Sequence, residues 1–148
     1  MKTINFEIEI KAPAKKVYET MIGDKTYQAW TSVFNASSHA KGSWTKGSKI
    51  LFIGTDEQGK QGGMVSRILE NIPNKYISIE HYGMLKEGAE ILSGPEVERW
   101  AGSLENYTFN EKDGHTTLLV ALDSDEEYKS YFEEMWPKAL AKLKSLCE

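Results

Sequence analysis

The chain has 148 residues, which suits a single domain, and its 40% hydrophobic and 27% charged residues exclude an intrinsically disordered protein. The net charge is −4 and no basic stripe alternates with aromatic residues, which argues against a nucleic-acid partner. No apolar run reaches about 18 residues and no signal-peptide core opens the chain, so we expect no membrane insertion and a cytoplasmic location. The only cysteine, Cys147, excludes disulfide frameworks and cysteine zinc sites within one chain.

The first part of the chain predicts one strand followed by two short helices. Residues from Thr3 to Ile10 alternate strictly between polar and apolar, as in a half-buried strand. Pro13 suits the first turn of a helix over Ala14 to Ile22, and Gly23 ends it. Asp24 is placed to cap a second short helix, which we expect to reach Trp30.

The middle of the chain predicts further strands, which polar turns join into an antiparallel sheet. The expected strands are Lys49 to Ile53, Met64 to Ile72, Lys75 to Tyr82, Trp100 to Asn110 and His115 to Leu122, with a weak signal at Ser37 to Ala40. Gly83 to Arg99 breaks this rhythm, because it contains three glycines and Pro95. Loops of this length are often functional covers. A cover over a cavity and a plain connection with a short helix both remain open for this segment.

The last stretch, Ser124 to Glu148, predicts one long amphipathic helix. Ser124 followed by Glu127 predicts a capping box. Helical spacing places one broad apolar stripe on a single face: Tyr128, Tyr131, Phe132, Met135, Trp136, Ala139, Leu140, Leu143 and Leu146. The expected fold is therefore α+β, one domain over residues 1–148. A curved antiparallel sheet of six to seven strands wraps around this helix, with two short helices after the first strand.

Two polar side chains are predicted to point toward the helix. Strand alternation places His81 on the face of Ile79, and Glu105 on the face of Tyr107. A carboxylate there is costly to bury alone, so Glu105 needs a partner, which His81, Tyr107 or Arg99 could supply. His81 is either a hydrogen-bonded interior histidine or an acid/base group. Glu105 is either the polar floor of a pocket or a structural hydrogen-bonding residue.

Aromatic and soft apolar residues complete a candidate ligand site, although each alone is equally typical of a core. The predicted ligand-binding residues are Trp30, Phe34, His81, Trp100, Glu105, Tyr107, Phe132, Met135 and Trp136. No histidine lies at metal-site spacing from another His, Asp or Glu, and no nucleotide, metalloprotease or nucleophile motif occurs. We therefore expect no metal, no cofactor and no assignable catalytic residue.

Four segments resemble the START-like helix-grip superfamily, also called SRPBCC, and within it the activator-of-Hsp90-ATPase-1-like branch. Ile8 to Tyr18 is similar to the family's strand followed by a small residue, proline, valine and an aromatic residue. Gly63-Met64-Val65 resembles its G-x-V stretch, and Asp113 to Leu118 its Gly-x-Thr-x-Leu strand. Trp136 to Lys144 resembles its closing W-x-x-x-L-x-x-L-K helix. The likeness covers almost the whole chain.

The resemblance implies a cavity between the sheet and the helix, used by relatives for lipids, polyketides, plant hormones, chaperone activation or enzymatic cyclisation. We expect a non-enzymatic carrier or sensor that binds a hydrophobic small molecule. One alternative is a cyclase- or hydrolase-type enzyme, with His81 or Glu105 as acid/base. The other is a chaperone partner of the Hsp90-activator kind. Fold alone does not select among them.

Overall fold

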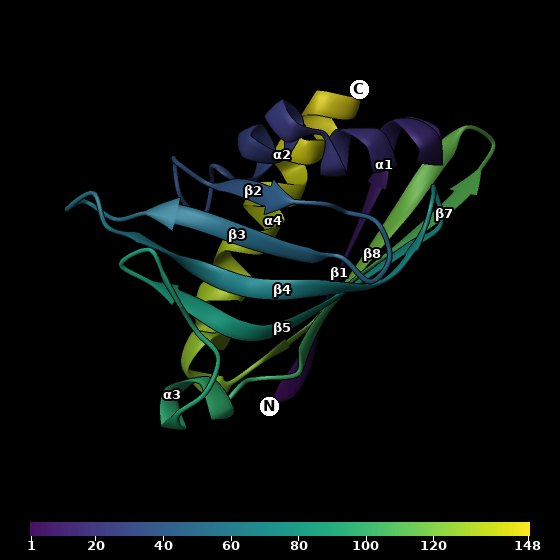
Figure 1. Cartoon of the computed structure of the whole chain (residues 1–148). Coiled ribbons are helices and arrows are strands. Elements are labelled where there is room, and N and C mark those ends of the chain that lie inside the picture. The colour runs from purple at the N-terminus through teal and green to yellow at the C-terminus, as the bar shows by residue number, and fades with distance from the viewer.

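An antiparallel sheet curves around one long helix, and shorter helices stand at the two ends of that helix (Figure 1). The computed structural model describes every residue from Met1 to Glu148. The strands are β1 (Lys2–Ile10), β2 (His39–Gly42), β3 (Lys49–Thr55), β4 (Gln61–Ile72), β5 (Tyr76–Lys86), β6 (Ala89–Ile91), β7 (Ser103–Lys112) and β8 (His115–Ser124). The helices are α1 (Ala14–Ile22), α2 (Asp24–Thr31), α3 (Pro95–Glu98) and α4 (Glu126–Cys147).

The strand order is β1-β8-β7-β5-β4-β3-β2, with β6 attached to β5. All pairings are antiparallel, as hairpin connections require. The predicted α+β class, with a curved sheet around a C-terminal helix and two short helices after the first strand, is confirmed. The sheet has one strand more than expected, because the short β6 forms inside the segment predicted to be irregular.

The core lies between the concave face of the sheet and the C-terminal half of α4. Trp136 is only 4% exposed, and its ring lies among those of Phe6, Trp30, Phe34 and Tyr107 at centroid distances from 5.3 to 6.2 Å. In the next two turns toward the C-terminus, α4 buries Ala139, Leu140 and Leu143. Helices α1 and α2 also pack against α4, near its C-terminal end (Figure 1).

The N-terminal half of α4 is packed differently from its C-terminal half. Tyr128 and Tyr131 belong to the same apolar stripe, yet they are 52% and 42% exposed. Short α3 lies near this end of α4, opposite α1 and α2 (Figure 1). The stripe therefore continues past the filled core, and its first turns face space that the sheet does not fill.

The beginning of α4 corrects the predicted capping box. Ser124 is the last residue of β8, where it pairs with Lys2 of β1, so it cannot also begin the helix. Asp125 caps the helix instead, and its side chain accepts a hydrogen bond from the Tyr128 amide at 3.3 Å. In the same way, Gly23 rather than Asp24 precedes α2, and Asp24 is the first helical residue.

The segment from Gly83 to Arg99 is more regular than predicted. Its first residues extend β5 to Lys86, and Ala89–Ile91 then returns as β6. Helix α3 and a turn follow, so Trp100 lies before β7 rather than in it. None of the helices is both long and apolar enough to cross a membrane.

Candidate functional site

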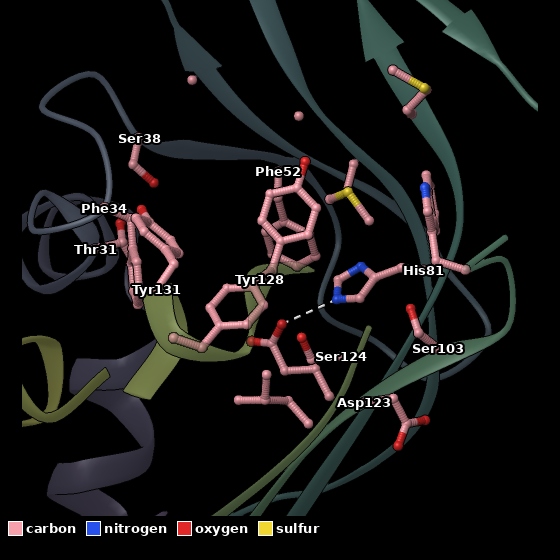
Figure 2. Close-up of a pocket in the computed structure, with 18 of the residues that line it drawn as sticks. Thr31, Phe34, Ser38, Phe52, His81, Ser103, Asp123, Ser124, Tyr128 and Tyr131 are labelled. Carbon is pink, nitrogen blue, oxygen red and sulfur yellow. Dashed lines mark hydrogen bonds and ion pairs between the residues drawn. The ribbon is translucent and has the colours of Figure 1, made fainter. Parts of the chain in front are cut away.

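A cavity of about 550 Å³ lies between the N-terminal half of α4, helix α2 and the concave face of the sheet. Of the 28 residues that line it, 16 are hydrophobic. Figure 2 shows Thr31, Phe34, Ser38 and Tyr131 on one side and His81, Ser103 and Ser124 on the other, with Tyr128 between them. This volume and lining are typical of small-molecule sites.

Aromatic rings form the inner wall of the cavity. The ring of Tyr27 lies within 6 Å of those of Trp30, Trp44 and Phe52, which ties α2 to the β2–β3 end of the sheet. The indole nitrogen of Trp30 donates a hydrogen bond to the Met21 carbonyl at 3.0 Å, so this buried ring has its one polar atom satisfied. The wall is therefore fixed by packing before any ligand arrives.

A chain of four polar side chains crosses the floor of the cavity. Ser66 Oγ lies 2.6 Å from His81 Nδ1, and His81 Nε2 lies 3.0 Å from Glu105 Oε1 (Figure 2). The Tyr107 hydroxyl donates to the other carboxylate oxygen, Glu105 Oε2. The strands explain this order, because β4, β5 and β7 are neighbours and their inward side chains stand in one row.

The buried end of this chain fixes the protonation pattern of the imidazole. Ser66 is fully buried and its hydroxyl has no partner except His81 Nδ1, so it donates to that nitrogen. His81 then carries its proton on Nε2 and donates it to Glu105. Because Ser66 is out of reach of the cavity, it is a supporting residue and not a nucleophile.

The exposed end of the chain is available to a ligand. The side chains of His81 and Glu105 are 12% and 24% exposed, and both line the cavity. Carboxylate oxygens each have a second lone pair, so Glu105 can accept another hydrogen bond while keeping His81 and Tyr107. Across the cavity, burial raises the pKa of Tyr27, and the Glu105 carboxylate raises it further. Tyr27 is thus a neutral hydroxyl that faces a negative charge.

The structure brings together seven of the nine residues predicted to bind a ligand. Those that line the cavity are Trp30, Phe34, His81, Trp100, Glu105, Phe132 and Trp136. Tyr107 is 2% exposed and lies beneath the floor, where it holds Glu105. Met135 is half-buried and does not line the cavity, whereas its helix neighbours Phe132 and Trp136 do. Of the three partners considered for Glu105, the structure shows His81 and Tyr107. The third, Arg99, pairs with Asp125 and Glu127 instead.

Several lining residues were missed by the sequence reasoning. The main ones are Tyr27, Phe52, Met64, Met84, Tyr128 and Tyr131. Tyr128 and Tyr131 carried a signal, since both lie on the apolar stripe of α4. Met64 and Met84 carried none on their own, because their cross-strand pairing depends on the register of β4 and β5. No group of three His, Cys, Asp or Glu side chains is arranged to hold a metal ion.

Comparison with protein families matches residues 11–148 to the family described as "Activator of Hsp90 ATPase homolog 1-like protein". A comparison with curated proteins finds no match. Among solved structures, protein MLL2253 from Mesorhizobium loti is 15% identical, with a TM-score of 0.73 and coverage of 98% of this chain and 96% of that one. The Aha1 dimer from Colwellia psychrerythraea is 22% identical, with a TM-score of 0.73 and coverage of 100% and 97%. CalU16 from Micromonospora echinospora is 17% identical, with a TM-score of 0.66 and coverage of 99% and 76%. At these identities the solved structures are evidence for the fold alone.

Proposed function

The chain belongs to the Activator of Hsp90 ATPase homolog 1-like family, and we propose that it is a carrier or sensor that binds a hydrophobic small molecule between its sheet and α4. The observation that carries the proposal is the cavity of about 550 Å³, with a mostly apolar lining and one polar pair on its floor. A few convergent polar groups in an apolar cavity orient a ligand, while the apolar walls supply most of the affinity.

The geometry supports one orientation for the bound molecule. Its polar end lies at His81 and Glu105, and its apolar body extends along Phe132 and Trp136 toward Trp100. Tyr128 and Tyr131 then cover the part of the ligand that is closest to solvent, which gives their exposed rings an apolar partner. Burying such rings against a ligand removes apolar surface from water on both sides.

Native mass spectrometry of protein purified from cells tests the proposal, since a retained ligand adds a defined mass. The Ser38→Trp variant places a large ring at the cavity wall, whereas Ala36→Trp places the same ring on an exposed loop position outside the lining. We expect the added mass in the natural protein and in Ala36→Trp, and its loss in Ser38→Trp. Equal ligand content in all three proteins contradicts binding in this cavity.

A second candidate function is an enzyme that acts on the bound molecule. The observation in its favour is the hydrogen-bonded pair of His81 and Glu105, because both residues line the cavity and belong to the types that serve as general acids and bases. Incubation of the recovered ligand with the protein distinguishes the two. Conversion that disappears in His81→Ala supports an enzyme, and an unchanged ligand supports a carrier.

A chaperone partner of the Hsp90-activator kind is a third candidate, favoured by the family description alone. Its test is a pull-down of purified Hsp90 with this chain, read together with the ATPase rate of the chaperone. Binding that survives in Ser38→Trp places the contact outside the cavity, and absence of binding removes this candidate.

A further inference from the structure

We infer that the molecule bound in this cavity carries a protonated amine on an apolar body, and that carboxylates and phosphates are excluded. The inference rests on the proposed function, because it concerns the ligand of the same cavity. It follows from the signs of the charges around the cavity, and from which of them already have partners.

The lining contains four carboxylates and one imidazole, but no lysine and no arginine. The four acids are Glu96, Glu105, Asp123 and Asp125. An anionic ligand group in an apolar site needs a cation or a set of free donors to replace its hydration. The lining residues offer two candidate cations. Both nitrogens of His81 are already engaged by Ser66 and Glu105, and the α-ammonium group of Met1 belongs to a residue that is 59% exposed to water.

Two of the four acids are neutralised or turned away from the ligand. Asp125 pairs with Arg99 at 3.3 Å and caps α4, so the positive end of the helix dipole is already occupied by a carboxylate. Asp123 accepts hydrogen bonds from the Thr3 hydroxyl and the Leu104 amide, on the side of β8 away from its inward residues. Arg99, the N-terminus of α4 and the donors around Asp123 are therefore already paired with carboxylates of the protein.

Glu105 is the acid that faces the ligand without a cation beside it. Its partners are a neutral imidazole, since His81 Nδ1 accepts from Ser66, and a neutral phenol from Tyr107. The Glu105 side chain is 24% exposed and retains free lone pairs on its carboxylate oxygens. Glu96, an exposed residue of α3, adds a further negative charge to the lining. An ammonium group of a ligand would donate a charge-assisted hydrogen bond to the Glu105 carboxylate, a kind of contact that no side chain of the cavity floor supplies.

The test uses three probes with the same apolar body: decylamine, decanol and decanoate. Three tryptophans line the cavity, so tryptophan fluorescence reports binding, with titration calorimetry as the second measurement. At neutral pH we expect decylamine to bind roughly tenfold or more tightly than decanol, because it adds a charge-assisted contact, and decanoate to bind weakest.

Matched variants assign the preference to one carboxylate. Glu105→Gln keeps the shape of the side chain and removes its charge, so the preference for decylamine over decanol should largely disappear. Glu133→Gln makes the same change on the exposed face of α4, outside the lining, and should leave the preference unchanged. Ser38→Trp should block all three probes, which separates cavity binding from attraction to the acidic surface.

Each outcome has a distinct meaning. Binding of decanol and decylamine with equal affinity, or tighter binding of decanoate, overturns the inference and leaves the proposed function standing. A preference for decylamine that persists in Glu105→Gln also overturns it, because the charge then acts from elsewhere. Failure of all three probes to bind overturns the proposed function, and the inference falls with it.

Discussion

His81 Nε2 and Glu105 Oε1 lie 3.0 Å apart, although 24 residues separate them and they belong to different strands. In the register of β5 and β7, His81 pairs with Ser103 and Ile79 pairs with Glu105, so the two polar side chains are diagonal neighbours on one face. The pair is supported from both sides, by Ser66 and by Tyr107. This arrangement is costly to break, because its inner members cannot reach water.

We expect His81→Ala to lower the free energy of unfolding by about 1–3 kcal/mol. The substitution leaves the buried Ser66 hydroxyl without an acceptor, and an unsatisfied buried polar group carries a cost of that size. Adding Ser66→Ala removes the orphaned hydroxyl, so the double variant should be less destabilised than the sum of the two single variants. Urea melts of the four proteins measure this.

The control for that cycle is His115→Ala, which removes an imidazole from the exposed end of β8. Surface changes of this kind usually stay within about 0.5 kcal/mol. If His81→Ala is as mild as His115→Ala, the Ser66 hydroxyl has another acceptor, and the protonation pattern assigned to His81 is wrong.

Much of the fold followed from local patterns. Helix α1 begins at Ala14 and ends at Ile22 as predicted from Pro13 and Gly23. Pro13 fixes its own φ at −67° just before the helix, and Gly23 leaves the helix in an extended conformation, with φ −62° and ψ 142°. The strict alternation in β1 and β8 gave their inward faces correctly, as the burial of Ile10 and Leu118 shows. Such patterns require only the residues within one element.

The cavity could be predicted only in part, because its shape depends on how far apart the elements stand. Nothing local distinguishes Trp136, which fills the core, from Tyr128, which faces the cavity, since both lie on one stripe of α4. The cap of α4 also depended on a distant segment, because pairing with Lys2 keeps Ser124 in β8. Registers and spacings of this kind are tertiary properties.

The Trp136→Ala variant tests whether α4 is the central packing element. Trp136 is almost fully buried among four aromatic rings, and loss of such a side chain costs roughly 3–5 kcal/mol. Lys142→Ala, on the exposed face of the same helix, should change the free energy of unfolding by less than about 0.5 kcal/mol. A urea melt that gives less than about 1 kcal/mol for Trp136→Ala would contradict the central role of this helix.

A glycine at position 63 is required where β4 passes β3. Gly63 has a φ of 143°, and an added Cβ would lie 1.8 Å from the Phe52 carbonyl oxygen, which is backbone and cannot rotate away. Gly59 also has a positive φ, 79°, but no atom lies within 4 Å of its added Cβ. We expect Gly63→Ala to lower the melting temperature far more than Gly59→Ala, which bears only the backbone strain of about 1 kcal/mol. Similar melting temperatures would show that β3 and β4 separate at little cost.

The segment from Gly83 to Arg99 remains the candidate cover of the cavity, and hydrogen exchange tests its mobility. Lys86 and earlier residues belong to β5 and should exchange slowly, so we now place the mobile part between Glu87 and Arg99. This part is tied to the rest mainly by the three residue pairs of β6 with β5 and by the buried Val97. Few buried contacts mean a low free energy of local opening, and amides there should exchange much faster than those of Ile77 or Phe109.

Binding of a ligand in the cavity should slow amide exchange near Glu96 and Trp100, which line the cavity. Protection equal to that of Ile77 in the free protein would instead identify the segment as a fixed insertion.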